Sequence, residues 1–162
     1  MIRLRPYKSS DAAAILSWCK TEKEFYQWTA GRLGEYPITE KEFDSVSSLM
    51  PFVAFDESGI TGFFTLRVPE GKTDELRFGF VICDSEKRGR GCGKEMLRLG
   101  MIFAFDIYHA KRVSLGVFEN NPSAYHCYKA AGFKEAVQNP PEMYHVMGED
   151  WKCLELVKEK EE

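Results

Sequence analysis

The sequence predicts a mixed α/β fold, in which helices cover both faces of a twisted, mostly antiparallel sheet of about six to seven strands. Three apolar segments rich in Phe, Val, Ile and Leu follow one another in the middle of the chain, joined by short turns. A helix–strand–helix run and a closing hairpin come after them. With 162 residues, 44% of them hydrophobic and 29% charged, the chain suits one packed domain spanning residues 1–162.

The first fifty residues are expected to be mostly helical. Apolar and charged residues alternate over 2–6, which predicts a short strand that ends at a proline. Helical spacing of apolar residues predicts helices over 12–20 and 22–30. The run T-E-K-E at 39–42 is a capping box, and it predicts another short helix toward residue 49.

The rest of the chain alternates between strands and helices. Strands are expected over 52–56, 62–68, 75–83, 112–117, 143–147 and 151–157. Helices are expected over 93–108 and from Asn121-Pro122 to Gly132. The last residues, 158–162, are expected to form a solvated fringe.

Charge and cysteine usage exclude several classes of protein. The formal net charge of −3 provides no long-range attraction to nucleic acid or to an anionic membrane. No apolar stretch is long enough to span a bilayer, and no export signal follows the first charged residues. Five cysteines without a C-x-x-C pair disfavour a metal site and a disulfide framework, and fit a reducing cytoplasm.

The densest chemical signal lies between a predicted strand and a predicted helix, at residues 86–94. It combines three alternating glycines with four cations: Gly89, Gly91, Gly93, Lys87, Arg88, Arg90 and Lys94. Glycines bring backbone N–H groups close to a ligand, and the start of a helix adds its positive dipole end. The segment therefore predicts a polyphosphate site. Its spacing fits neither a Walker loop nor a dinucleotide fingerprint.

Two motifs in this region resemble those of a known family. Arg88-x-x-Gly91-x-Gly93 after a strand resembles the acetyl-CoA pyrophosphate loop of the GNAT acetyltransferases. The segment from Asn121 to Phe133, N-P-S-A-Y-H-C-Y-K-A-A-G-F, resembles the second signature of that superfamily. The two motifs cover residues 76–133, and the order of the other elements fits the GNAT-like fold.

The resemblance implies acetyl-CoA as cosubstrate and assigns residues to it. The backbone of Val81, Ile82 and Cys83 would leave the neighbouring strand and bind the pantetheine arm and the thioester carbonyl. The pyrophosphate would lie against Arg88, Gly89, Arg90, Gly91, Cys92, Gly93 and Lys94. Asn121 would contact the cofactor arm, and its position also suits a helix N-cap.

The resemblance places Tyr128 near the thioester sulfur, where the alternative is a tyrosine of the core. A phenol with a pKa of about 10 is a weaker acid than a thiol near 8.5, so hydrogen-bond donation to the departing sulfur suits it better than full proton transfer. Glu75 is the candidate general base, because it begins the strand that leads to the loop. It can instead pair with Arg77, which lies on the same face by period two.

The predicted activity is transfer of acetyl from acetyl-CoA to a primary amine, on a small molecule, a peptide N-terminus or a lysine. The acceptor is expected between the N-terminal helices and the final hairpin, among Phe25, Tyr26, Trp28, Tyr36, Tyr144 and His145. One alternative is a non-catalytic acyl-CoA sensor or interaction module with the same fold. Another is a phosphotransferase, which would need a metal-binding acidic pair. A homodimer is the one protein partner kept open.

Overall fold

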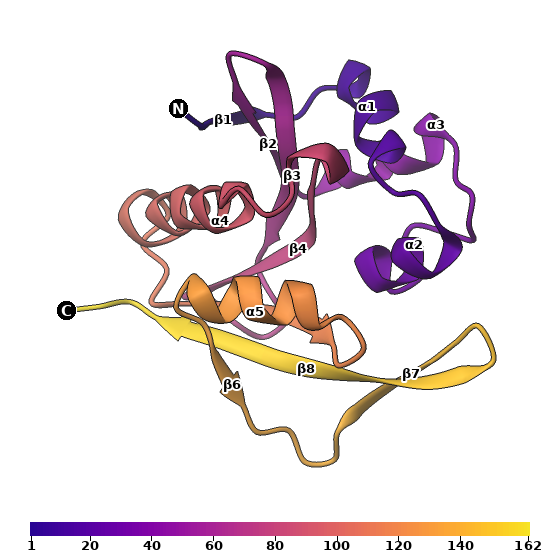
Figure 1. Ribbon diagram of the computed structural model, residues 1–162. Helices are drawn as coiled ribbons and strands as arrows, with labels where there is room; N and C mark the ends of the chain where they lie inside the picture. The colour runs from indigo at the N-terminus through magenta and orange to yellow at the C-terminus, as the bar shows by residue number, and fades with distance from the viewer.

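The computed structural model describes all 162 residues and contains one eight-stranded sheet. The strand order is β1-β2-β3-β4-β5-β8-β6, with β7 also pairing with β8 (Figure 1). Every pair is antiparallel except β4 and β5, which run parallel. The strands are β1 (Arg3–Pro6), β2 (Met50–Asp56), β3 (Gly59–Arg67), β4 (Glu75–Cys83), β5 (Arg112–Phe118), β6 (Lys134–Ala136), β7 (Glu142–Val146) and β8 (Glu149–Glu159). The mostly antiparallel mixed sheet expected from the sequence is confirmed.

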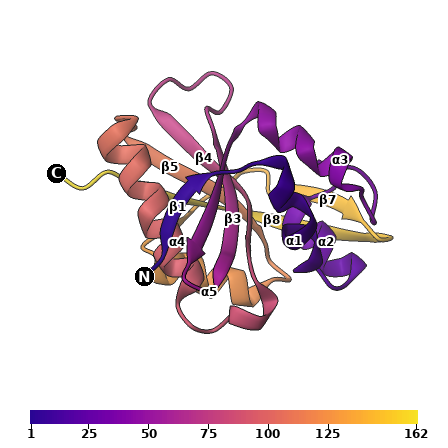
Figure 2. The same cartoon turned by 90° about the horizontal axis from the view of Figure 1, so that it is seen from above.

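Helices cover both faces of this sheet (Figure 2). The helices are α1 (Ala12–Ser17), α2 (Glu22–Thr29), α3 (Glu40–Phe43), α4 (Cys92–Ile102) and α5 (Pro122–Ala130). Because side chains alternate along a strand, neighbours such as Val53 and Ala54 point into different cores. One core packs under α4 and α5, and the other packs under the N-terminal helices. None of the helices has the length and apolar character that crossing a membrane requires.

Several element ends differ from the sequence-based expectation. β8 continues through Lys158 and Glu159, which pair with the start of β5, so the predicted solvated fringe begins two residues too early. The three-residue strand β6 was not predicted. Backbone hydrogen bonds between strands need no apolar side chain. These polar residues form strands because they pair with β5 and β8, and their sequence alone has no strand pattern. The first helix ends at Ser17, and a π-helix over Phe103–Ile107 continues α4.

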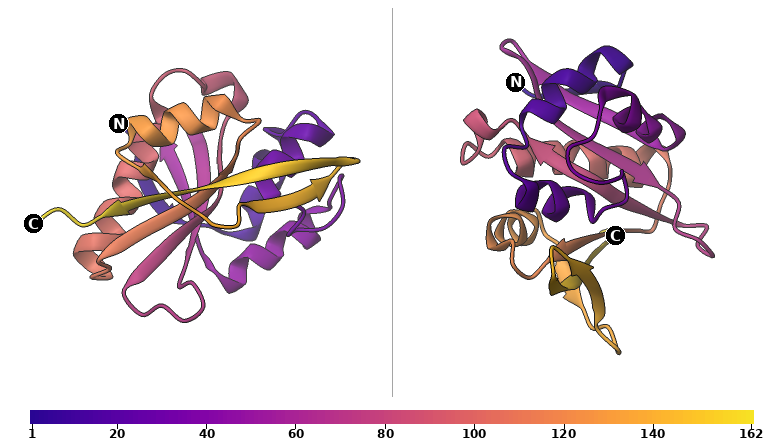
Figure 3. Two further views of the ribbon diagram at one scale, coloured as in Figure 1. Left: turned by 90° about the horizontal axis from the view of Figure 1, so that it is seen from below. Right: turned by 90° about the vertical axis from the view of Figure 1, so that its right-hand side faces the viewer.

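The sheet opens between its two parallel strands. β4 pairs with β5 only from Glu75 to Arg77, and the remainder of β4 pairs with β3 alone. The β3–β4 register shifts between Phe63 and Thr65, and opposite this shift Phe80 takes a positive φ of 50°. The bulge and the opening leave the second half of β4 with a free backbone edge. The β7–β8 hairpin extends toward the N-terminal helices beside this opening (Figure 3).

Candidate active site

The loop between β4 and α4 presents a run of free backbone donors. Gly89 and Gly91 have φ values of 81° and 77°, a left-handed conformation that favours glycine. The N–H groups from Gly89 to Lys94 donate no hydrogen bond within the chain, and the first bond in this region is from Glu95 N to the Gly91 carbonyl, at 3.0 Å. Successive free N–H groups at the start of an eleven-residue helix form a site for an anion.

The side chains around this loop leave its backbone accessible. Cys92 is buried, and its Sγ donates to the Thr61 carbonyl at 3.8 Å. A Cβ at Gly93 would lie 3.1 Å from Cys127 Sγ, so α4 and α5 approach closely here. The exposed cations of the loop form no ion pair within the chain: Arg88, Arg90 and Lys94. The loop therefore offers both N–H donors and uncompensated positive charge.

The free edge of β4 continues from this loop toward the middle of the sheet. Val81, Ile82 and Cys83 lie beyond the last pair between β4 and β5. Trp28 Nε1 of α2 donates to the Phe80 carbonyl at 2.8 Å, and this bond anchors α2 beside the bulge. The structure thus brings the predicted pantetheine segment next to the predicted phosphate loop.

The second motif forms α5, which begins with Asn121 as its N-cap. Asn121 Oδ1 accepts a hydrogen bond from Ala124 N at 3.3 Å, and Pro122 occupies the first turn. Tyr128 lies on the same helix and is buried, with 8% of its surface exposed. Burial, followed by the nearby Cys127 and Cys83 thiols, raises the pKa of Tyr128 well above its ordinary value. Its hydroxyl is therefore neutral and able to donate.

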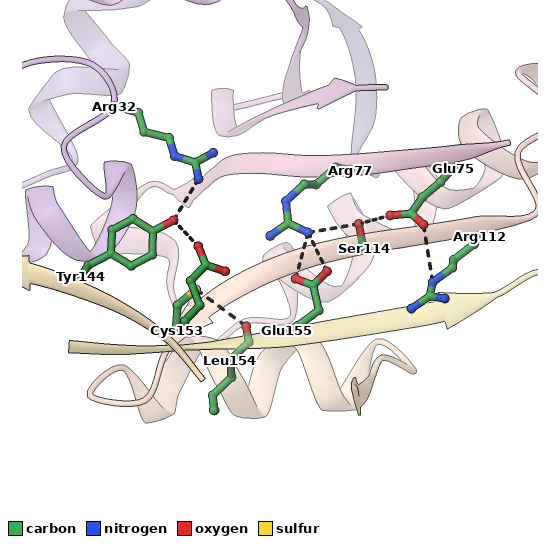
Figure 4. Close-up of polar contacts among 10 residues, drawn as sticks. Arg32, Glu75, Arg77, Arg112, Ser114, Tyr144, Cys153, Leu154 and Glu155 are labelled. Atoms are coloured by element: carbon green, nitrogen blue, oxygen red, sulfur yellow. Dashed lines mark hydrogen bonds and ion pairs between the residues drawn. The ribbon is translucent and has the colours of Figure 1, made fainter. Parts of the chain in front are cut away.

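Glu75 lies apart from the other predicted site residues. It accepts a hydrogen bond from Ser114 Oγ at 2.8 Å and lies 3.6 Å from Arg112 Nε (Figure 4). Eight residue steps along β4 separate it from Cys83, or about 26 Å at the rise of an extended chain. The predicted alternative pair with Arg77 is wrong, because Arg77 Nη1 binds Glu155 at 2.9 Å. Glu75 thus holds β4 and β5 together where they are paired.

A cavity of about 260 Å³ lies beside the opening of the sheet. α2, β3, β4, β5, β7 and β8 contribute to its wall. Trp28 and Tyr144, which the sequence placed near the acceptor, line it, whereas His145 is exposed and pairs with Asp150 at 2.9 Å. The other predicted aromatics do not line it: Phe25, Tyr26 and Tyr36.

The sequence-based reading missed the arginines of this cavity. Arg32, Arg67 and Arg77 all line it. Arg67 and Arg77 are Cα partners on β3 and β4. Counting outward from the predicted strand ends, 68 and 75, would have placed Arg67 opposite Leu76, so only the observed register aligns the two arginines. Arg32 follows α2 and meets Tyr144 only through the tertiary fold, where its Nη2 donates to the phenol oxygen at 2.9 Å.

The fold and the site define a mixed α/β protein with an anion loop after β4 and a small cavity beside the opening of the sheet. The sequence model described as the acetyltransferase (GNAT) domain matches residues 2–134. The chain belongs to this family.

Known relatives agree with this assignment. Over 73 residues the chain is 37% identical to the spermine/spermidine N(1)-acetyltransferase of Bacillus subtilis (strain 168), which is 45% of this chain and 48% of that protein. The chain thus spans about half the length of the curated relatives it matches.

Solved structures show the same fold at low sequence identity. The spermidine N-acetyltransferase of Vibrio cholerae, in complex with CoA and spermine, superposes with a TM-score of 0.80 at 18% identity, over 98% of this chain and 95% of the other. A GNAT-family acetyltransferase of Bacillus anthracis superposes with a TM-score of 0.77 at 14% identity, over 99% and 96%.

Proposed function

We propose that this protein is an N-acetyltransferase that moves the acetyl group of acetyl-CoA to a primary amine. The run of free N–H donors from Gly89 to Lys94, next to the free edge of β4, carries the proposal. Similar proteins named as spermine and spermidine acetyltransferases, and a similar fold with bound CoA, support it.

The residues of the loop and the strand fit the two chemical parts of acetyl-CoA. The loop N–H groups, with Arg88, Arg90 and Lys94, would hold the pyrophosphate, because they combine directed donors with positive charge. The backbone of residues 81–83 would hold the pantetheine arm as an added strand. Asn121 uses its oxygen for the helix cap, and its side-chain amide N–H groups would reach the arm.

The transfer forms one bond and breaks one. The neutral amine nitrogen bonds to the acetyl carbon while the carbon–sulfur bond breaks, the amine loses a proton and the sulfur gains one. Tyr128 would donate a hydrogen bond to the departing sulfur, since its buried phenol stays protonated. Glu75 would act on the fold rather than as the general base, because it is bound to Ser114 and Arg112.

A thermal-shift titration with CoA and acetyl-CoA tests the cofactor, with ATP plus magnesium as the competing ligand. Acetyl-CoA at one hundred times its Kd should raise the free energy of unfolding by about 2.7 kcal/mol. Arg88→Glu should abolish this shift, while Lys41→Glu, an exposed reversal on α3, should retain it. A shift with ATP alone would instead support the phosphotransferase.

Turnover separates the enzyme from its alternative. Release of the free CoA thiol with an amine acceptor is expected, whereas acetyl-CoA binding without release across a broad panel of amines would support the acyl-CoA sensor.

We also infer a cytoplasmic location, because all five cysteines carry free thiols. A homodimer remains a prediction, to be checked by sedimentation.

A further inference from the structure

The cavity beside the sheet opening is lined by three arginines and by no acidic residue. We call Arg32, Arg67 and Arg77 the arginine cluster. A site for a polycation would need carboxylates, since a charge that leaves water needs an opposite partner. The lining of this cavity is positively charged instead, so the cavity suits a ligand with a negative group.

The fold holds two of these arginines in an unfavourable arrangement. Arg67 and Arg77 lie directly opposite one another on β3 and β4, and like charges in this position destabilise a sheet. Glu155 forms an ion pair with Arg77 and not with Arg67, and both its carboxylate oxygens lie 2.9 and 3.0 Å from Arg77 Nη1 (Figure 4). Arg67 forms no ion pair and no side-chain hydrogen bond within the chain. Burial, then Arg77 and Arg32, lower the pKa of Arg67, as expected in a positive field.

Donors of the cluster remain available on the side of the opening. Arg77 uses Nη1 for Glu155 and Ser114, while its Nη2 makes no hydrogen bond within the chain. A Cβ at Gly116 would lie 3.1 Å from that Nη2, so the glycine on β5 keeps the space beside it open. Guanidinium groups match the planar oxygens of a carboxylate or the oxygens of a phosphate with paired N–H donors.

We propose that the acetyl acceptor is a small amine that also carries a carboxylate or phosphate group, which binds the arginine cluster. This inference rests on the proposed acetyl transfer. The volume of about 260 Å³ fits a molecule of amino-acid size. Arg67 and Arg77 lie where the pairing of β4 with β5 ends. Trp28 and Phe80 line the same cavity beside the free edge of β4, where the amine would meet the acetyl group.

Matched acceptors test the proposal through initial rates of CoA release. The panel pairs each L-amino acid with its amide and phosphoethanolamine with ethanolamine, and it includes spermidine. At least one anionic amine should have a kcat/KM about 10- to 100-fold above that of its uncharged counterpart, the range for a charged hydrogen bond. The pair with the larger ratio identifies the anion as carboxylate or phosphate.

Arg67→Gln should bring that ratio close to one and leave the thermal shift with CoA unchanged. Arg3→Gln, an exposed arginine on β1, should preserve the ratio. Without ligand, the melting midpoint of Arg67→Gln should equal or exceed that of the wild type, because the substitution removes repulsion between like charges. A lower midpoint would show that Arg67 supports the fold and would overturn its role in binding.

The experiments distinguish failure of the proposed anionic acceptor from failure of the proposed acetyl transfer. Preferred acetylation of spermidine, or equal rates for acids and amides, would overturn the anionic acceptor and leave acetyl transfer standing. Failure to bind CoA would instead overturn the proposed function. Stabilisation of the CoA-free protein by the same acids and phosphoethanolamine, absent in Arg67→Gln, tests the arginine cluster independently of turnover.

Discussion

Burial gives two tyrosines of this protein different environments. Tyr128 is enclosed between α5 and the sheet, and burial keeps its phenol neutral by raising its pKa. Tyr144 on β7 donates to Glu142 Oε1 at 2.5 Å and accepts from Arg32 at 2.9 Å. The first phenol has no partner among the side chains and remains available to a ligand, whereas the second joins two parts of the chain.

Replacement of Tyr128 by Phe should reduce kcat without weakening acetyl-CoA binding. The hydroxyl is proposed to act only on the departing sulfur, so its loss should lower kcat about 10- to 100-fold. Steady-state kinetics and a CoA titration measure the two quantities. An unchanged kcat would show that Tyr128 is only a residue of the core.

Replacement of Glu75 by Gln should lower the stability of the protein and leave kcat nearly unchanged. The substitution weakens the contacts to Ser114 and Arg112, whose Nε is already buried without a hydrogen bond. Urea unfolding should show a loss of about 1–3 kcal/mol. The value of kcat should stay within about twofold of the wild type, because five residue steps, or roughly 17 Å of strand, separate Glu75 from Phe80, beside which the amine would meet the acetyl group. A large fall in kcat at unchanged stability would restore Glu75 as the base.

At the scale of the element, β4 makes three different kinds of contact along its length. Its first residues pair with β5, its bulge at Phe80 contacts α2 through Trp28, and its last residues lead into the loop of free N–H donors. The parallel pairing ends after Arg77, and this end creates the free edge. One strand thereby joins the structural and the functional parts of the sheet.

Gly91→Ala tests whether the loop conformation serves the cofactor. A Cβ at Gly91 meets no atom within 4 Å, so the cost of about 1–2 kcal/mol comes from the positive φ of 77° alone. Gly71→Ala is a matched control with φ of 76° and the same open space. Both variants should lose similar stability, and only Gly91→Ala should weaken CoA binding in calorimetry. Equal CoA affinity in both would exclude a role for the loop backbone.

At the scale of the whole molecule, the final hairpin and the N-terminal helices enclose the cavity from opposite ends of the chain. Arg32 reaches Tyr144 across a sequence separation of 112 residues, and Gln27 reaches Asn120 across 93. Figure 3 shows the hairpin extending toward these helices. The cavity proposed for the acceptor therefore forms only when both ends of the chain are folded.

Tyr144→Phe should loosen this enclosure. The loss of its bonds to Arg32 and Glu142 should raise the KM for the acceptor by roughly fivefold, equivalent to about 1 kcal/mol, with little change in CoA affinity. Tyr36→Phe is the control, because the Tyr36 hydroxyl makes no hydrogen bond within the chain. A weaker affinity for CoA in Tyr144→Phe would contradict the assignment of the hairpin to the acceptor.

Local signals predicted the elements that hold the cofactor motifs. The alternation of glycines and cations at 86–94 and the cap at Asn121 are short-range patterns, and the structure forms the loop and the helix at those places. β6 and the end of β8 escaped prediction, because their polar residues form strands only by pairing with distant backbone. Glu75 was placed in the right strand, but its partners Ser114 and Arg112 lie on another.

The sequence by itself determined the order of the elements other than β6, the mixed sheet and the position of the glycine-rich loop, because each follows from patterns of residues close together in the chain. Only the tertiary structure decided how far β4 and β5 stay paired, which arginines face the cavity and where Glu75 is bound. These features depend on strand register and on contacts between segments about a hundred residues apart in the chain. The proposed cofactor side of the site is therefore local in sequence, and the proposed acceptor side is a product of the fold.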